Sequence, residues 1–271
     1  MSSNPFLIAI SRKSPYTQRA YRSILNTYLK FISYKQPFNT VTVNQFLNHL
    51  ESEKSQSYVS SAWSVLKLFF EVYNKPFINI PCPKVDLYRQ AHPTLSIEDI
   101  TQLISIVREQ GTLQEKAFWA IGTTFGLRNS ELCQITQDNI NKDKIFIDTK
   151  KGGFPRWHLI PEQIAPQVLN YTFKPIPIIT GWLLFRSIFI NHNGGITEKG
   201  FSWHSIRRRL IKELDKIDSL TEKDLLIFFR YAQGKGSMIG RYARLDSDED
   251  KLFEIDKKVF QSHPFLRFWE N

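Results

Sequence analysis

The sequence predicts a mainly α-helical fold with a small antiparallel β-sheet, built as two parts joined by a linker. Apolar residues recur at three- and four-residue spacing over most of the chain, and two short β-rich runs flank a glycine-containing turn near residue 150. A proline-rich stretch interrupts the helical pattern. With 271 residues and 42% hydrophobic side chains, the chain is long enough to fill two cores, and disorder is not expected.

Residues 1–80 are predicted to form a helical module. A long amphipathic helix should begin at Ser14 and Pro15, which suit a cap and a first helical turn. Two further helices are expected from about residues 43 and 57. The basic residues Arg19 and Arg22 are expected on the outer face, where they can meet phosphate oxygens or serve as ordinary solvated side chains. The apolar stripes of the three helices are formed by Tyr21, Ile24, Leu25, Tyr28, Leu29, Ile32, Val43, Phe46, Leu47, Leu50, Val59, Trp63, Leu66, Phe69 and Phe70.

Residues 81–93 are predicted to form an extended linker, because repeated X-Pro steps disfavour regular structure. Residues 94–271 then begin with a helix capped at Ser96. Further helices are expected at 114–125 and 130–135, strands at 144–149 and 156–160, and helices again from Pro161, with a looser stretch at 174–180 and a turn at 191–195. A tail helix is expected over about 251–260.

The formal charge of +10 and the pI near 9.5 indicate a polyanionic partner, although a ribosomal or membrane-surface protein would show the same balance. Cys82 and Cys133 have neither a zinc-type spacing nor partners for a disulfide framework, which favours a reducing compartment. No apolar stretch approaches the roughly 20 residues of a membrane helix, and no leader pattern is evident. A cytoplasmic location, that of the host if a mobile element encodes the chain, is therefore expected.

An arginine at the start of a predicted helix is the first candidate for chemistry. Arg128 follows Gly126, which lets the backbone turn sharply, and precedes Glu131, whose carboxylate is within reach of the guanidinium. A guanidinium held by a carboxylate is preorganised to bind a phosphate. The alternative is a routine ion pair on a helix surface.

Further cations follow at later joints of the chain. Lys150, with Lys151 beside it, is expected where a strand ends, so its flexible ammonium could reach a bound phosphodiester or simply be solvated. His204 and Arg207 fall on one helical face and could point at the same phosphate. A packed histidine beside a basic patch that includes Arg208 is the alternative.

Two tyrosines near the end of the chain are candidate nucleophiles. Tyr231 lies in an apolar run and is predicted to be a core residue within a helix. Tyr242 is flanked by Arg241 and Arg244, and nearby positive charge favours the phenolate form of a group whose unperturbed pKa is about 10. Tyr242 is therefore the predicted nucleophile. The cations would hold the charge that builds up on the attacked phosphodiester, with no metal or other cofactor.

The order Arg, Lys, His-x-x-Arg, Tyr, together with the box Gly-Leu-Arg-x-Ser-Glu-Leu, resembles the tyrosine recombinases, which include phage and plasmid integrases and Xer-type resolvases. The resemblance covers nearly the whole chain. It implies that residues 1–80 are a core-binding domain and residues 94–271 a catalytic domain with a tail helix, the two closing on duplex DNA as a clamp. It also implies a site-specific recombinase that cleaves and rejoins DNA through a 3′-phosphotyrosyl intermediate.

The resemblance further implies a role for each matched residue. Arg128 and Arg207 would clamp the scissile phosphate, and Lys150 would protonate the leaving 5′ oxygen. His204 would hydrogen-bond a non-bridging oxygen and assist the proton transfer from the nucleophile. Tyr242 would form the covalent bond to the 3′ phosphate.

One box departs from the family pattern. The family commonly has Leu-Gly-His shortly before the tyrosine, whereas this chain has Gln233, Gly234 and Lys235. The resemblance implies that Lys235 stands in for the histidine and donates to a phosphate oxygen, as in a Gln-Gly-basic box of some archaeal virus and plasmid integrases.

The partners implied by the resemblance are double-stranded DNA with a specific recombination site and further copies of the chain, as a tetramer on DNA. The aromatic-rich tail would dock on its own domain or, as the family favours, on a neighbouring protomer. Two alternatives remain: a type IB topoisomerase-like enzyme that relaxes DNA, and a catalytically inactive DNA-binding protein.

Overall fold

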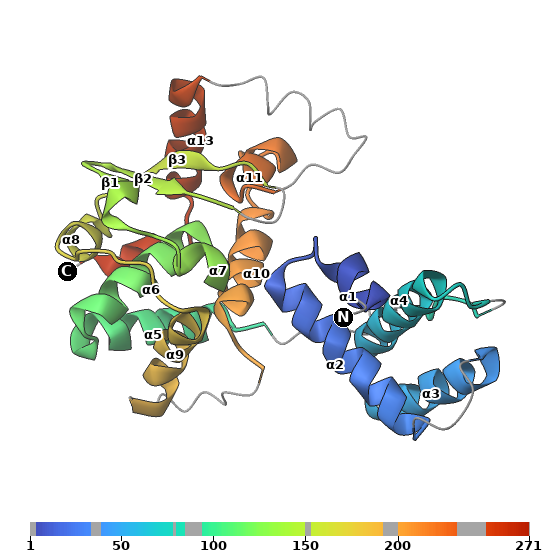
Figure 1. Cartoon of the computed structure of the whole chain (residues 1–271). Coiled ribbons are helices and arrows are strands. Elements are labelled where there is room, and N and C mark those ends of the chain that lie inside the picture. Colours follow the sequence, from blue (N-terminus) through green and yellow to red (C-terminus); the bar gives the residue numbers. More distant parts are fainter. Residues whose placement is uncertain are drawn as a thin grey trace. The chain divides into compact units, whose positions relative to one another are not determined.

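The chain divides into two compact units, Met1–Ala91 and His92–Asn271. The computed structural model describes residues 4–33, 39–77, 80–84, 94–149, 153–191, 200–231 and 248–270. Helices predominate in these residues, and the second unit also contains a small antiparallel sheet (Figure 1). This is the fold class that the sequence predicts.

The first unit consists of helices, and its centre is apolar. The predicted cap at Ser14 is present, since its Oγ accepts a hydrogen bond from the Thr17 N–H at 3.2 Å. A short first helix, capped by Asn4, was not predicted. The helix α4 packs against the other three helices, with Phe46, Leu66 and Phe70 fully buried between them. The helices are α1 (Pro5–Ile10), α2 (Pro15–Phe31), α3 (Thr40–Glu53) and α4 (Gln56–Val72).

The second unit surrounds the buried helix α6 with further helices and one sheet (Figure 1). Its strands pair in the order β1-β2-β3, all antiparallel, with Ile145 opposite His158. Its elements are α5 (Ile97–Gln110), α6 (Leu113–Phe125), α7 (Asn129–Leu132), β1 (Ile140–Asn141), β2 (Lys144–Ile147), β3 (Arg156–Leu159), α8 (Ala165–Leu169), α9 (Ile178–Asn191), α10 (Trp203–Leu214), α11 (Glu222–Phe228) and α13 (Glu249–Gln261), with 3₁₀ turns at Gln137–Asn139 and Leu266–Trp269.

The inward face of β3 is unusual for a strand in a core. Side chains alternate along a strand, and the buried positions of β2 are Ile145 and Ile147. The buried positions of β3 are instead Arg156 and His158. This edge of the sheet therefore brings hydrogen-bonding groups into the interior.

Three predicted helix boundaries were wrong. The helix expected at 130–135 ends at Leu132, and α9 begins at Ile178, inside the stretch expected to be loose. The apolar run containing Tyr231 is helical only to Phe228. Beyond Phe228 the chain makes a Schellman turn, in which the Tyr231 N–H donates to the Leu226 carbonyl at 3.0 Å.

The tail packs on its own unit, which is the first of the two docking alternatives. Helix α13 lies along β3 and α11, and the aromatic turn after it reaches α5 and α6. The Trp269 indole donates to Thr123 Oγ1 at 3.1 Å, and Arg108 donates to the Phe268 carbonyl at 3.2 Å. Burying these aromatic side chains removes the aggregation hazard that an exposed tail would present.

Candidate functional site

Arg128 and Glu131 form the preorganised pair that the sequence predicts. Helix α6 ends at Phe125 and is capped by Gly126, whose φ of 54° lies in the left-handed region. A Cβ atom there would also come within 3.0 Å of the Phe229 ring, so the site requires glycine. The turn places Arg128 at the cap of α7, where its N–H donates to Glu131 Oε2 at 2.9 Å and its Nη1 to Oε1 at 2.5 Å.

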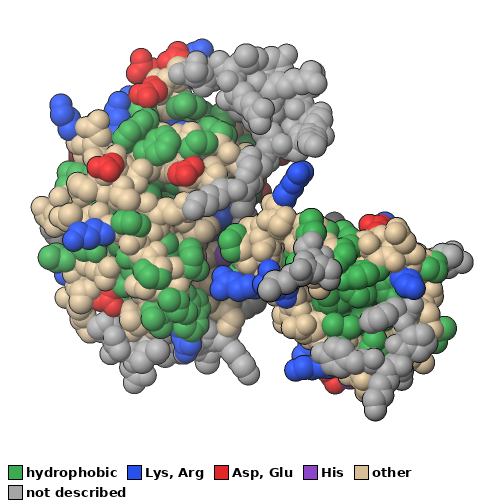
Figure 2. Space-filling model, viewed as in Figure 1, with side chains coloured by type: hydrophobic (Ala, Val, Ile, Leu, Met, Phe, Trp, Pro, Cys, Tyr) green, Lys and Arg blue, Asp and Glu red, His purple; other side chains and the backbone are tan. Residues whose placement is uncertain are grey.

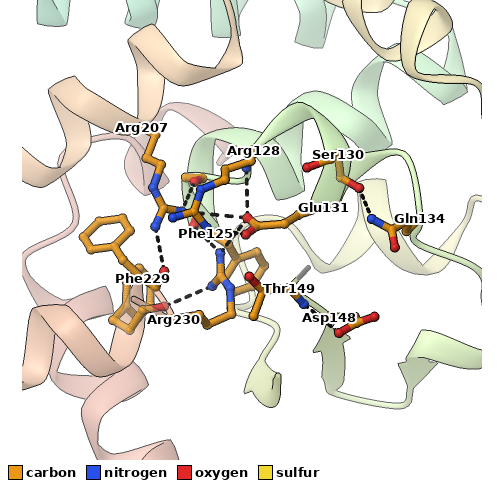
Figure 3. A network of polar contacts seen from close by, with 12 residues as sticks. Phe125, Arg128, Ser130, Glu131, Gln134, Asp148, Thr149, Arg207, Phe229 and Arg230 are labelled. Atoms are coloured by element: carbon orange, nitrogen blue, oxygen red, sulfur yellow. Dashed lines mark hydrogen bonds and ion pairs between the residues drawn. The ribbon is translucent and has the colours of Figure 1, made fainter. Parts of the chain in front are cut away.

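Arg207 joins this pair from a helix almost eighty residues later. It is fully buried, and its Nη1 and Nη2 donate to the carbonyls of Gly126 at 2.7 Å and Phe229 at 2.6 Å. Its Nη1 also lies 3.8 Å from Glu131 Oε2. The structure thus brings Arg128 and Arg207 together around one carboxylate (Figure 3).

A third guanidinium, which the sequence analysis missed, contacts the same carboxylate. Arg230 is fully buried, and its Nη2 lies 3.4 Å from Glu131 Oε2 while its Nη1 lies 3.0 Å from His158 Nε2 (Figure 3). Its φ is 55°, an uncommon value for a residue with a side chain. The one signal in the sequence is a charged residue directly after the apolar run that ends at Phe229, which is a weak indication by itself.

Tyr231 was expected in a helical core, and the structure corrects this. The residue follows the helix end and is half-buried. Its ring centroid lies 4.9 Å from the Arg207 guanidinium carbon and 5.6 Å from that of Arg128. Tyr231 therefore lies against both guanidiniums, a favourable cation–π geometry.

The charges around Glu131 determine its protonation state. Burial alone would raise the pKa of Glu131, but Arg230, the Arg128 N–H, and the guanidiniums of Arg207 and Arg128 outweigh it and hold the pKa below its usual value. The pKa of Arg207 is lowered by burial and by Arg128, while Tyr231 and Glu131 act in the opposite direction. Three guanidiniums thus face one carboxylate, and the excess positive charge suits an anion.

The other predicted catalytic residues are not all described. His204 is exposed on α10, one helical turn before Arg207. Thr149 and Gly153, which precede and follow residues 150–152 in the sequence, lie close together, and a Cβ atom on Gly153 would come within 2.1 Å of the Arg230 carbonyl oxygen. The predicted residues Lys150, Lys151, Lys235, Arg241 and Tyr242 lie outside the described residues.

The predicted DNA-contacting residues that are described lie on helices. Arg19 and Arg22 are exposed on α2 of the first unit, while Arg208 of α10 is half-buried and donates to Ser205 Oγ at 3.3 Å. On the face drawn in Figure 2, the Lys and Arg side chains of the larger unit are scattered among other types. The cations that converge are the three guanidiniums around Glu131.

The described part of the chain shows neither a candidate metal centre nor a membrane-spanning helix. It contains no group of three or more His, Cys, Asp or Glu side chains that could hold a metal ion. It also contains no helix that is both long and apolar enough to cross a membrane.

Comparison with known sequences finds a match to a tyrosine recombinase. No family model matches the sequence. A tyrosine recombinase from Thermosipho africanus (strain TCF52B) is 26% identical over 183 residues, which cover 61% of this chain and 64% of that protein. The match thus spans slightly less than two thirds of the length of that relative.

Solved structures share the fold at low sequence identity. A λ integrase dimer bound to a COC′ core site superposes with a TM-score of 0.63 at 14% identity, covering 89% of this chain and 74% of that chain. The Tn1549 transposon integrase in complex with transposon right end DNA gives a TM-score of 0.61 at 12% identity, covering 89% and 97%. The chain therefore shares its fold with these integrases, and its sequence and the order of its motifs are similar to those of a tyrosine recombinase.

Proposed function

We propose that this protein is a site-specific DNA recombinase that cuts and rejoins double-stranded DNA through a 3′-phosphotyrosyl intermediate. The observation that carries the proposal is the convergence of Arg128 and Arg207 on Glu131. Two guanidiniums from distant parts of the chain, both oriented by one ionised carboxylate, form a site for a doubly contacted phosphate. Their fixed charge would stabilise the phosphorane before any rearrangement is needed.

The reaction would use the tyrosine that the sequence analysis selected. The Tyr242 phenolate oxygen attacks phosphorus, a new P–O bond forms to the tyrosine, and the bond to the 5′ oxygen breaks. Lys150 gives the leaving 5′ oxygen its proton, while His204 and Lys235 donate to non-bridging oxygens. Rejoining reverses these steps with a 5′ hydroxyl from another strand, so no external energy source is consumed.

Phosphate binding would require one local rearrangement. Arg207 is fully buried and Tyr231 lies against its guanidinium, whereas the side chain of Arg128 is 20% exposed. We infer that the phosphate meets Arg128 first, and that the Tyr231 ring then moves aside to open Arg207. Such a movement exchanges one cation–π contact for a stronger charge-assisted hydrogen bond.

The proposed partners follow from the same chemistry. Structures of λ integrase include a dimer on a core site and a tetramer bound to a Holliday junction. We propose an assembly of four copies on duplex DNA, with residues 1–80 as core-binding domain, residues 81–93 as linker and residues 94–271 as catalytic domain. Exposed Arg19 and Arg22 of the first unit are suited to backbone contacts there. We place this activity in the cytoplasm of the cell that holds the DNA.

The decisive experiment detects the covalent intermediate. Nicked suicide duplexes tiled across the DNA that flanks the coding sequence are incubated with purified protein, and denaturing gels reveal any protein–DNA adduct. The expected result is an adduct with the wild-type protein that Tyr242→Phe abolishes. Tyr171→Phe serves as the matched control, since Tyr171 packs against Phe118 and Phe173 in the hydrophobic core.

The other outcomes of this experiment distinguish a different nucleophile and the two alternative functions. An adduct that persists in Tyr242→Phe and disappears in Tyr231→Phe would move the nucleophile to Tyr231. Relaxation of supercoiled plasmid without strand exchange between paired sites would favour the topoisomerase alternative. Specific binding without any adduct would indicate an inactive DNA-binding protein and overturn the proposal.

A further inference from the structure

A chain of four buried polar side chains connects the tail helix to the guanidinium pair. Asp256 Oδ1 of α13 lies 3.0 Å from His158 Nδ1 of β3, and His158 Nε2 lies 3.0 Å from Arg230 Nη1. The Nη2 atom of Arg230 then lies 3.4 Å from Glu131 Oε2. We call these four residues the buried relay; none of them is more than 2% exposed.

The hydrogens of the buried relay can be assigned from its chemistry. A guanidinium only donates, so His158 Nε2 must accept from Arg230, and the imidazole hydrogen must sit on Nδ1, where it is donated to Asp256. Burial first, then Arg156 and Arg230, lowers the pKa of His158 well below its usual value. The imidazole is therefore neutral. It accepts a hydrogen bond from Arg230 at Nε2 and donates one to Asp256 at Nδ1.

At the α13 end of the buried relay, the Asp256 carboxylate is fixed by several hydrogen bonds. Besides His158, Asp256 accepts hydrogen bonds from Arg156 Nη2 at 2.8 Å and from the Leu159 N–H at 3.0 Å, all three donors belonging to β3. The carboxylate is thus fixed by the docking of α13 on the sheet. Undocking α13 would remove Asp256 from His158 and leave the imidazole free to turn.

Arg230 occupies its position against local preference. It follows the cap of α11 in a Schellman turn with φ of 55°, a place where glycine is usual. The carbonyl of the preceding Phe229 accepts from Arg207, and the following Tyr231 lies against both catalytic guanidiniums. Residues held in such conformations cluster at functional sites, where the surrounding structure over-determines them.

We propose that Arg230 is a positioning residue, which orients Arg128 and Arg207 through Glu131 and makes that orientation depend on the docking of α13 through His158 and Asp256. This role rests on the proposed function, since orienting the pair matters for the cleavage step. Arg230 itself, fully buried beneath the pair, does not touch DNA. It acts on the rate of cleavage and not on binding.

The first test reads the state of Glu131 directly. Its carboxyl carbon is titrated by ¹³C NMR in the full-length protein, in the wild type and in Arg230→Met. Glu131 faces Arg128, Arg207 and Arg230. Loss of one opposite charge at this distance should raise its titration midpoint by roughly one pH unit or more. Arg209→Met is the matched control, because Arg209 bonds to Leu95 and Glu213 instead.

The second test separates positioning from binding. Arg230→Met should slow formation of the covalent adduct between about 10- and 100-fold, as expected when reacting groups are misplaced by about an ångström. Its Kd for the same duplex should stay within roughly 3-fold, because many other phosphate contacts remain. Arg230→Lys, which keeps the charge and loses the second donor, should be intermediate.

The third test addresses the link to α13. His158→Phe keeps an aromatic ring against Phe125 and Phe228 but removes both relay nitrogens, whereas His263→Phe changes a buried histidine that bonds to the Thr124 carbonyl. Only His158→Phe should slow adduct formation. If Arg230→Met does not fold, Arg230→Lys and His158→Phe still decide the proposal.

Three results would overturn the proposal: a Glu131 midpoint unchanged in Arg230→Met, unchanged adduct formation in that variant, or a Kd that weakens in parallel with the rate. A wild-type protein that forms no adduct would overturn the proposed function instead. The Glu131 titration would then still decide whether Arg230 lowers the titration midpoint of that carboxylate.

Discussion

The two units bury different kinds of side chain. Among the described residues of the first unit, the buried hydroxyls of Tyr28 and Thr42 bond to each other at 3.0 Å, and every other buried side chain is apolar. The second unit encloses charged and titratable groups in its core. Among its described residues they are Glu115, Glu131, Cys133, Arg156, His158, Arg207, Arg230, Asp256 and His263.

This difference agrees with the proposed function, which places the reaction in the second unit. The described core of the first unit is built from apolar helix faces, whereas burying charges adds a desolvation cost that apolar residues of similar size would avoid. Glu131 and its three arginines are therefore poorly explained by stability alone. Their convergence fits the proposed function, in which the guanidiniums are held in one geometry before a phosphate binds.

The largest stability effect should come from neutralising the carboxylate at the centre of this cluster. Glu131→Gln leaves Arg207 and Arg230 buried without a counter-charge, so we expect the free energy of unfolding in urea to fall by about 3–5 kcal/mol. Glu213→Gln removes a partly exposed carboxylate paired with Arg209 and Lys216 and should cost less than about 1 kcal/mol. Equal effects of the two changes would contradict the assigned role of the buried charge.

In the first unit, the largest losses in the free energy of unfolding should come from substitutions that leave a cavity in the apolar core. Leu66 is fully buried on α4, so Leu66→Ala should lower the free energy of unfolding by about 3 kcal/mol. Val41, which is 61% exposed, provides the control, and Val41→Ala should cost less than about 0.5 kcal/mol. Hydrogen exchange followed by mass spectrometry should show the lost protection in residues 4–77. A loss spread equally over the second unit would contradict the division into two units.

Acid should lower the stability of the second unit through the buried histidine His263, which lies apart from the buried relay. Burial lowers the pKa of His263 to about 4, with the Thr124 carbonyl acting in the opposite direction. Between pH 4 and 6.5 the unfolded histidine binds a proton that the folded one does not. The stability from this group is therefore complete above pH 6.5 and is lost on acidification, at about 1.4 kcal/mol per pH unit.

Comparison with His263→Gln isolates this contribution. Asp256, whose pKa burial raises to about 7, contributes with the opposite sign but is present in both proteins and cancels in the difference. The stability of the wild type should therefore fall more steeply than that of the variant between pH 6.5 and 4 in chemical denaturation. If the free energies of unfolding of the two proteins change with pH in parallel, then His263 binds its proton in the folded protein as readily as in the unfolded one.

The smallest effect should come from the polar pair of the first unit. Tyr28→Phe removes the hydroxyl that meets Thr42 Oγ1 at 3.0 Å. Thr42 retains its bond to the Asn39 carbonyl at 2.9 Å, so we expect a loss of about 1 kcal/mol in the free energy of unfolding. A loss above about 3 kcal/mol would mean that the first unit also depends on its buried polar groups.

Several predictions of local structure were confirmed because their causes lie within a few residues. Ser14 and Ser96 cap helices as expected, each with its Oγ accepting a backbone N–H three residues later. The tail helix was also correctly predicted from its amphipathic spacing. The pairing of Arg128 with Glu131 belongs to this group, since the two residues are one helical turn apart.

Other features depended on residues distant in sequence. The end of α11 at Phe228 was missed, because Arg230 adopts a left-handed conformation without the glycine that normally marks such an end. Tyr231 was predicted to be a core residue because its sequence neighbours are apolar. In the structure its ring lies against the guanidiniums of Arg128, at the cap of α7, and Arg207, on α10. The roles of Lys150, Lys235 and Tyr242 stay predictions.

By itself, the sequence determined the helical class of both units, the apolar stripes, the caps and the order of the cationic motifs, because periodicity and capping act over one or two helical turns. Only the tertiary structure decided that Arg128, Arg207 and Arg230 share Glu131, and that α13 connects to them through His158. The physical reason is that burial and pairing of charge depend on which distant elements pack together, and no spacing along the chain records that.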